Sequence, residues 1–137
     1  MDSIKVADCM SRQFVSFSAG MSVVDAAIEL VQNELLGGPV VDDAGRLVGW
    51  VSEQECLAVV SEVIYYSDRV ATVSDIMRDD VLAVGLHDSV LDLATQMQQQ
   101  KPKIYPVLDE NNKVVGVVSR RLILREMCER IAHPELA

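Results

Sequence analysis

The chain contains the same residue pattern twice. The stretch from Val6 to Leu57 recurs from Val73 to Leu124 at a constant offset of 67 residues, with no gap needed to align the copies. Identical matched residues include Val6/Val73, Asp8/Asp75, Met10/Met77, Ser22/Ser89, Asp25/Asp92, Pro39/Pro106, Asp42/Asp109, Gly49/Gly116 and Ser52/Ser119. Two long copies do not suit a solenoid, which stacks many small repeats. The pattern therefore predicts a pseudo-two-fold pair of halves that share one core.

The length of 137 residues is that of one ordinary domain. Each copy alone would bury only a marginal core, so the two are expected to pack their apolar faces on each other. We divide the chain into residues 1–66 and residues 67–137, which together form one tandem module. A cleft along the axis of such a pair is the first place to expect a ligand.

Charge excludes some partners and favours others. The net charge of −9 opposes a nucleic-acid backbone, whose binding depends on Lys and Arg, so we expect no nucleic-acid partner. Residues 1–68 carry three basic and eleven acidic side chains, whereas residues 69–137 carry nine and ten. An anion should therefore prefer the second half. No stretch approaches the roughly 18 apolar residues of a membrane span, and no leader segment is visible, so we expect a cytoplasmic protein without a membrane partner.

The residues usual in catalysis and metal binding are sparse. The cysteines Cys9, Cys56 and Cys128 lack CxxC spacing, which predicts buried, reduced thiols and no zinc site. His87 and His133 lie far apart in the sequence. Neither a nucleophile–base pair nor a glycine-rich phosphate loop is present, so we do not expect an enzyme.

Each copy predicts a short helix or turn, a strand and then an amphipathic helix. The first elements are expected at residues 6–10 and 73–77, and the strands at residues 14–17 and 81–84. The helices should follow the N-cap residues Ser22 and Ser89, with Asp25 and Asp92 completing capping boxes.

A hairpin and a second helix complete each copy. The hairpins pair residues 39–41 with 47–51 and residues 106–108 with 114–118, and their turns hold Gly45 and Asn112 at matching positions. These residue types tolerate a positive φ, so we predict left-handed backbone at both. The second helices should begin near Ser52 and Ser119. The fold class is therefore α/β, with the order β-α-β-β-α occurring twice.

The ordered motifs resemble the CBS (cystathionine β-synthase type) domain family. Asp-x-Met comes before the first strand, Pro-Val-Val-Asp or Pro-Val-Leu-Asp opens the hairpin, and Gly-x-Val-Ser closes it. Nearly the whole chain is covered, which indicates a stand-alone tandem CBS pair.

The resemblance implies a regulatory module that senses an adenosine-containing ligand in the cleft between the repeats. The expected effectors are AMP, ADP, ATP or S-adenosylmethionine, and no cofactor is required. In the family, a Gly-x-x-Ser/Thr-x-x-Asp motif at the second helix holds ribose and phosphate. This implies ligand contacts for Ser52 and Glu55 in the first copy and for Ser119 in the second. Phosphate suits such a position because a helix N-terminus offers unpaired N–H groups and a positive dipole end.

The two copies depart from the family motif differently. Glu55 stands where the family has Asp, and Leu122 takes that position in the second copy. The second copy instead gathers Lys103, Arg120 and Arg121, which predicts a phosphate-binding cleft there. Ser52 with Glu55 is equally well explained as a structural capping box. The alternative for the three basic residues is a solvated face.

Apolar residues near the first strands are candidates to pack against adenine. They are Val15, Leu82, Met10 and Met77. Residues of this kind at regular positions are also ordinary core residues, and that alternative stays open.

The alternative function is a ligand-free dimerisation or partner-binding module with filled clefts. Tandem CBS pairs often associate through helices, so we expect a homodimer that uses the apolar face with Val59, Val63 and Ile64.

Overall fold

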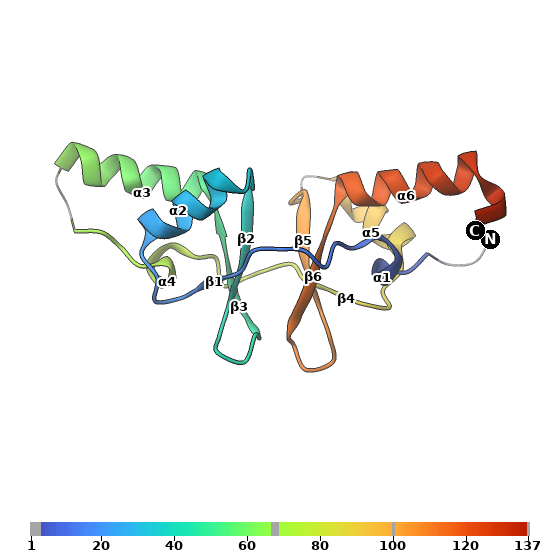
Figure 1. The fold of residues 1–137 in the computed structure, drawn as a ribbon, viewed down its shortest axis with the longest axis horizontal. Coiled ribbons are helices and arrows are strands. Elements are labelled where there is room, and N and C mark those ends of the chain that lie inside the picture. Colours follow the sequence, from blue (N-terminus) through green and yellow to red (C-terminus); the bar gives the residue numbers. More distant parts are fainter. Residues whose placement is uncertain (1–3, 67–68, 100, 137) are drawn as a thin grey trace. The chain divides into compact units, whose positions relative to one another are not determined.

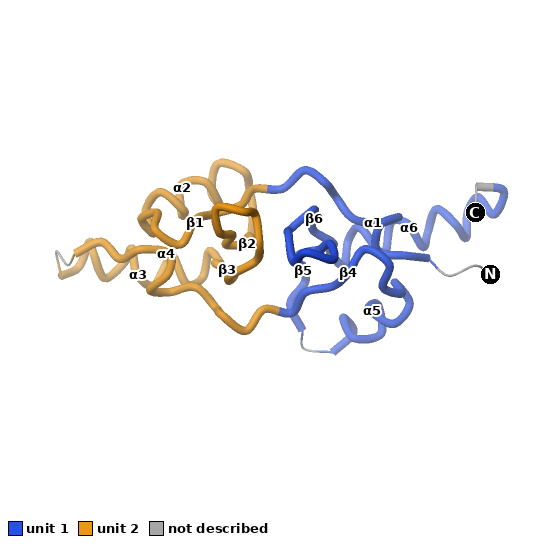
Figure 2. Tube along the Cα trace, turned by 90° about the horizontal axis from the view of Figure 1, so that it is seen from below, with its two compact units in different colours: residues 1–14, 82–137 blue, residues 15–81 orange. Residues whose placement is uncertain are grey.

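Two compact units make up the computed structural model, which describes residues 4–66, 69–99 and 101–136. Unit 2 spans residues 15–81, and unit 1 combines residues 1–14 with residues 82–137 (Figure 2). Each unit has its own cluster of buried apolar side chains. The prediction of one shared core is therefore wrong for the described residues, which bury their apolar side chains in two separate clusters.

The units do not coincide with the sequence copies at residues 1–66 and 67–137, because the short first helices are exchanged. Helix α1 (Val6–Cys9) joins unit 1, where the Val6 N–H donates to the Asp88 carbonyl at 3.0 Å. Helix α4 (Val73–Ile76) joins unit 2, where the Val73 N–H donates to the Met21 carbonyl at 2.9 Å. Val6 and Val73 are both fully buried, so each contributes to the core built mainly from the other copy.

Each unit contains a three-stranded sheet. In unit 2 the order is β1 (Phe17–Ser18), β2 (Gly37–Val41) and β3 (Leu47–Ser52), with β1 parallel and β3 antiparallel to β2. Unit 1 repeats this with β4 (Val84–Gly85), β5 (Ile104–Leu108) and β6 (Val114–Ser119). The hairpins agree with prediction, but the first strands are shorter and later than predicted at residues 14–17 and 81–84. Only the last residue of each predicted stretch and the residue that follows it pair with the central strand.

Two helices in each unit begin where predicted, but the predicted capping boxes are only half formed: among the described residues, the serine hydroxyls cap the helices, and neither Asp25 nor Asp92 bonds back through its carboxylate. Helices α2 (Val23–Gln32) and α5 (Val90–Met97) begin after Ser22 and Ser89, whose hydroxyls accept from the N–H groups of Asp25 and Asp92 at 3.1 and 3.4 Å. Their buried residues recur at three- and four-residue spacing, as an amphipathic helix requires. Helices α3 (Glu53–Tyr66) and α6 (Arg120–Ala132) continue directly from β3 and β6 (Figure 1), and a short 3₁₀ helix, η1 (Pro134–Leu136), follows α6.

The hairpin turns confirm the predicted left-handed residues. Gly45 has φ 82° and Asn112 has φ 63°. In each turn an aspartate fixes the loop: Asp42 Oδ1 accepts from two backbone N–H groups at 2.9 Å, and Asp109 Oδ1 accepts from two at 2.8 and 3.0 Å. Glu34, which follows the C-cap residue Asn33 of α2, also has a positive φ of 54°, and the sequence did not predict it.

The cysteines are only partly as predicted. All three are free thiols, and Cys9 and Cys56 are buried, but Cys128 is exposed. Cys128 lies on α6 four residues after Leu124 and three before Ile131, two other exposed residues, so it belongs to the outward face of that helix. Within the described ranges, no helix is long and apolar enough to cross a membrane, and no group of three metal-binding side chains occurs.

Candidate ligand site

The start of helix α6 gathers the predicted phosphate-binding residues of the second copy. Ser119 caps the helix, its hydroxyl accepting from the Leu122 N–H at 3.1 Å. The Arg120 N–H donates to the Lys103 carbonyl at 2.9 Å. This bond ties the approach to β5 to the first residue of α6, so the two cationic residues share one location. Both are exposed, and Ser119 is half-buried.

A buried tyrosine lies beside this cationic group. Tyr105 on β5 is 2% exposed, and its hydroxyl has no hydrogen-bond partner among the described residues. Burial raises the pKa of this hydroxyl, and the nearby charge of Arg120 opposes that shift. A buried polar atom without a partner is costly and uncommon. Sequence reasoning missed Tyr105, although the tyrosine replaces Gly38 of the first copy and could have drawn attention to the site.

The start of helix α3 in unit 2 has the same backbone hydrogen bond as the start of α6, but its side chains are acidic or apolar where those of unit 1 are basic. The Glu53 N–H donates to the Leu36 carbonyl at 2.8 Å, as Arg120 does to Lys103. Here the capping box, which was the structural alternative for Ser52 and Glu55, is formed. Glu55 Oε1 accepts from the Ser52 N–H at 3.2 Å and from the Ser52 hydroxyl at 2.8 Å, and the Glu55 N–H donates back to that hydroxyl at 3.2 Å. One Glu55 oxygen is therefore already engaged in a structural role.

The candidate adenine-packing residues are divided between the units. Val15 is partly buried against the core of unit 2, whereas Leu82 in unit 1 is 45% exposed. Met77 and Met10 are partly buried against the cores of unit 2 and unit 1. Each methionine covers a strand glycine: a Cβ added at Gly49 would lie 2.7 Å from Met77 Sδ, and one at Gly116 would lie 3.3 Å from Met10 Cε. Of this set, Leu82 offers the most exposed apolar surface.

Only some of the predicted site residues are brought together. In unit 1 the backbone joins Lys103, Ser119 and Arg120 at one helix start, and in unit 2 Ser52 bonds to Glu55. The arrangement in unit 1 can bind an anion, because it combines two exposed cations with the N-terminus of a 13-residue helix whose first turn holds no acidic residue. The arrangement at the start of α3 in unit 2 lacks these cations and has Glu53 as its first helical residue.

Comparison with known proteins identifies the family. The CBS domain profile matches residues 6–62 and 73–129, which is most of the chain. The chain therefore belongs to the CBS domain family, with two tandem copies.

Relatives and solved structures give the same picture. The chain is 28% identical to uncharacterized protein MJ1004 of Methanocaldococcus jannaschii over 133 residues, covering 96% of this chain and 60% of that protein. It is also 28% identical to a homoserine O-acetyltransferase of Methanococcoides burtonii, covering 88% of this chain but 23% of the enzyme. The first three curated relatives are thus matched over 60%, 23% and 39% of their lengths.

The structural match is to CBS-pair proteins. The CBS-pair protein CBSX2 from Arabidopsis thaliana superposes with a TM-score of 0.85 at 26% identity, covering 96% of this chain and 99% of that one. A structure of CBSX2 in complex with AMP superposes with a TM-score of 0.79 at 28% identity, covering 91% and 96%. The predicted α/β tandem architecture is confirmed.

Proposed function

We propose that this chain is a regulatory module that binds an adenosine-containing ligand, with the ligand's phosphate at the start of α6. The observation that carries the proposal is the convergence of Lys103, Ser119 and Arg120, joined by the backbone bond between Arg120 and Lys103. The AMP bound in the CBSX2 structure supports the choice of ligand class.

Electrostatics favours a phosphorylated ligand at this position. The first N–H groups of a helix lack intrahelical acceptors, and the helix dipole adds partial positive charge. Lys103 and Arg120 add two full charges beside them, and hydrogen bonds to charged groups contribute about 1.5–3 kcal/mol each. The hydroxyl of Tyr105 is buried without a hydrogen-bond partner among the described residues, and the charge of Arg120 opposes the rise that burial causes in its pKa.

The ribose is held less well than in the family motif. Leu122 occupies the position of the family's ribose-binding acid, and its side chain is half-buried and apolar. In unit 2 the acid Glu55 is present but bonded to Ser52. We therefore expect phosphate recognition to dominate and the affinity to be modest, in the micromolar to millimolar range.

Regulation rather than catalysis is proposed for this chain. The match to the acetyltransferase spans 23% of that enzyme, so the enzyme's activity is not carried over. A regulatory ligand acts by binding one conformation of the protein more tightly than another. No cofactor is needed for this role, and a cytoplasmic location stays a prediction.

A thermal-shift panel tests the proposal. AMP, ADP, ATP, S-adenosylmethionine and adenosine are each titrated to millimolar concentration, because binding to the folded state raises the melting temperature. The phosphorylated ligands should raise it more than adenosine does. If none of the five changes the melting temperature, the ligand-binding function is wrong.

The second candidate function is a dimerisation or partner-binding module without a ligand. It is favoured by the exposed apolar side chains of α3 and α6, among them Leu57, Ile64, Leu124 and Ile131. We propose a homodimer in either case. Of the predicted contact residues, Val59 packs partly against the core of unit 2, whereas Ile64 is 79% exposed and free for a contact of this kind.

A further inference from the structure

Each unit is packed against by a short strap of chain that ends just before the chain crosses to the other unit. The first strap, residues 4–11, contains α1 and belongs to unit 1, and the chain enters unit 2 at residue 15. The second strap, residues 71–78, contains α4 and belongs to unit 2, and the chain enters unit 1 at residue 82. A change in how a strap is held is therefore a change next to a covalent connection between the units.

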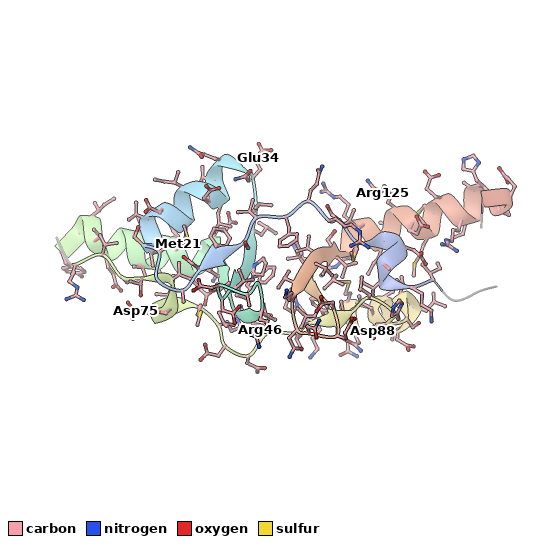
Figure 3. The ribbon with its side chains drawn as sticks, turned by 60° about the horizontal axis from the view of Figure 1, so that its bottom comes forward. Met21, Glu34, Arg46, Asp75, Asp88 and Arg125 are labelled. Atoms are coloured by element: carbon pink, nitrogen blue, oxygen red, sulfur yellow. The ribbon has the colours of Figure 1, made fainter. Side chains whose placement is uncertain are left out.

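The backbone holds the two straps in the same way. The residues that bond to them occupy matching positions of the two copies: Leu86, Asp88, Val90 and Val117 for the first strap, and Ala19, Met21, Val23 and Trp50 for the second. All of these backbone hydrogen bonds are between 2.8 and 3.0 Å long. Figure 3 labels Asp88 and Met21, whose carbonyls accept from the first residues of α1 and α4. A difference between the straps must therefore come from side chains.

Charged side chains join the first strap to α6. Arg130 on α6 donates through Nε to Glu126 Oε1 at 3.1 Å, and its terminal nitrogen lies 3.9 Å from Asp8 Oδ2 on α1. The Arg130 side chain is only 19% exposed, whereas that of Asp8 is 45% exposed. Without the guanidinium, the carboxylates of Asp8 and Glu126 would lie near each other and repel. One partly buried cation thus holds α1 on α6.

The buried thiol of Cys9 lies close to these charges. Cys9 is the last residue of α1, and its side chain belongs to the core cluster of unit 1. Burial raises the pKa of this thiol, Glu126 and Asp8 raise it further, and Arg130 opposes them. Because the thiol faces the core, a reagent reaches it only when the first strap opens.

The second strap is held by apolar contact instead. At the offset of 67 residues, the positions of Arg130, Glu126 and Cys9 are occupied by Val63, Val59 and Ile76. Val59 and Ile76 pack against the core of unit 2, and α3 contains no Lys or Arg. Asp75, the counterpart of Asp8, accepts hydrogen bonds from the backbone N–H and the hydroxyl of Thr72. The second strap is therefore a matched control within the same chain.

We propose that Arg130 is an ionic latch that keeps the first strap closed on unit 1, and that this strap opens locally when the ion pairs are screened or lost. Partly exposed ion pairs weaken as salt is added, whereas apolar contacts do not, so the two straps respond differently to ionic strength. Opening frees α1 next to the connection with unit 2 and gives reagents access to Cys9. The inference does not depend on which ligand binds.

Hydrogen–deuterium exchange by mass spectrometry tests the latch in the unaltered protein, because amide exchange reports local opening. Deuterium uptake is followed in peptides that cover residues 4–11 and 71–78, at about 50 mM and about 1 M NaCl. The first strap should exchange about threefold faster at the higher salt concentration, because screening reaches its partly exposed ion pairs. The second strap should change by less than about 1.5-fold.

Two substitutions on α6 test the role of Arg130. Arg130→Met keeps the apolar length of the side chain and removes its charge. It should speed exchange of the first strap by about threefold or more at low salt and abolish the response to salt. Arg125→Met is the control, since Arg125 is exposed on the same helix and forms no ion pair among the described residues. It should change neither strap by more than about 1.5-fold.

The buried thiols give a second readout. In a Cys128→Ser background, Arg130→Met should speed modification of Cys9 by about threefold or more and leave that of Cys56 in unit 2 unchanged. Equal salt responses of the two straps, or an Arg130→Met variant that exchanges like the original protein, would overturn the latch. If Arg130→Met does not fold, the salt comparison in the unaltered protein decides the matter. The thermal-shift panel judges ligand binding separately.

Discussion

The ring of Phe17 lies directly over Gly38 on the neighbouring strand. A Cβ added at Gly38 would come within 2.6 Å of Phe17 Cε2 and 3.1 Å of the Val15 carbonyl oxygen. In unit 1 the matching positions hold Val84 and Tyr105. The aromatic side chain thus comes from the first strand in unit 2 and from the central strand in unit 1, and the same exchange puts the Tyr105 hydroxyl near Arg120.

The first prediction concerns this packing. Gly38→Ala should destabilise the protein by about 1–3 kcal/mol, because the added methyl overlaps an aromatic ring that is itself buried. Gly20→Ala is the control, since nothing lies within 4 Å of a Cβ added there. Urea unfolding measures both. Equal stability of the two variants would contradict the described packing of Phe17 on Gly38.

A second prediction concerns the thiols. Cys128 should react quickly with a thiol reagent in the folded protein, because it is exposed, whereas Cys9 and Cys56 should react only on unfolding. Burial raises the pKa of Cys9 from 9.0 to about 11, with help from Glu126 and Asp8, so its reactive thiolate is scarce near neutral pH. Burial also raises the pKa of Cys56.

Titration with a chromogenic disulfide measures this. One thiol should be modified in native buffer and three in denaturant, and Cys128→Ser should remove the fast reaction. Rapid modification of all three thiols in the native protein would show that the two buried cysteines are placed wrongly.

The third prediction restores the family's ribose acid. Leu122→Asp should tighten AMP binding by about tenfold, because a carboxylate at this position can accept hydrogen bonds from ribose hydroxyls. The gain should be absent for a 2′,3′-dideoxy analogue of AMP, which lacks those hydroxyls. An equal gain for both ligands would count against ribose contact at residue 122.

The helix starts and the hairpin turns could be predicted from the sequence, because single residue types determine them. Ser22 and Ser89 predicted their helix starts, because a serine hydroxyl satisfies a free N–H group there. Gly45 and Asn112 predicted left-handed turns, because glycine and asparagine tolerate a positive φ better than other residues do. The exchange of α1 and α4 was not predictable, because a repeat with constant offset reads identically whether each short helix packs on its own copy or on the other.

The site was predictable in part. Lys103, Ser119 and Arg120 were identified from their positions in the repeat, and the Arg120–Lys103 backbone bond joins them. Tyr105 was missed because an aromatic residue in a strand ordinarily belongs to the core, and only the three-dimensional structure reveals that its hydroxyl lacks a partner. The strand starts predicted at residues 14 and 81 were three residues too early, because an apolar run does not reveal which of its residues pair with a neighbouring strand.

Calorimetric titration of AMP tests the central claim most directly, with Lys103→Glu compared against Lys113→Glu. Both substitutions reverse one exposed charge, but Lys113 lies at the opposite end of the β5–β6 hairpin from Ser119. We predict saturable AMP binding that Lys103→Glu weakens by about tenfold or more and Lys113→Glu leaves nearly unchanged, with adenosine binding far less affected. Equal weakening by the two substitutions, or no AMP binding at millimolar concentration, would contradict a phosphate site at the start of α6.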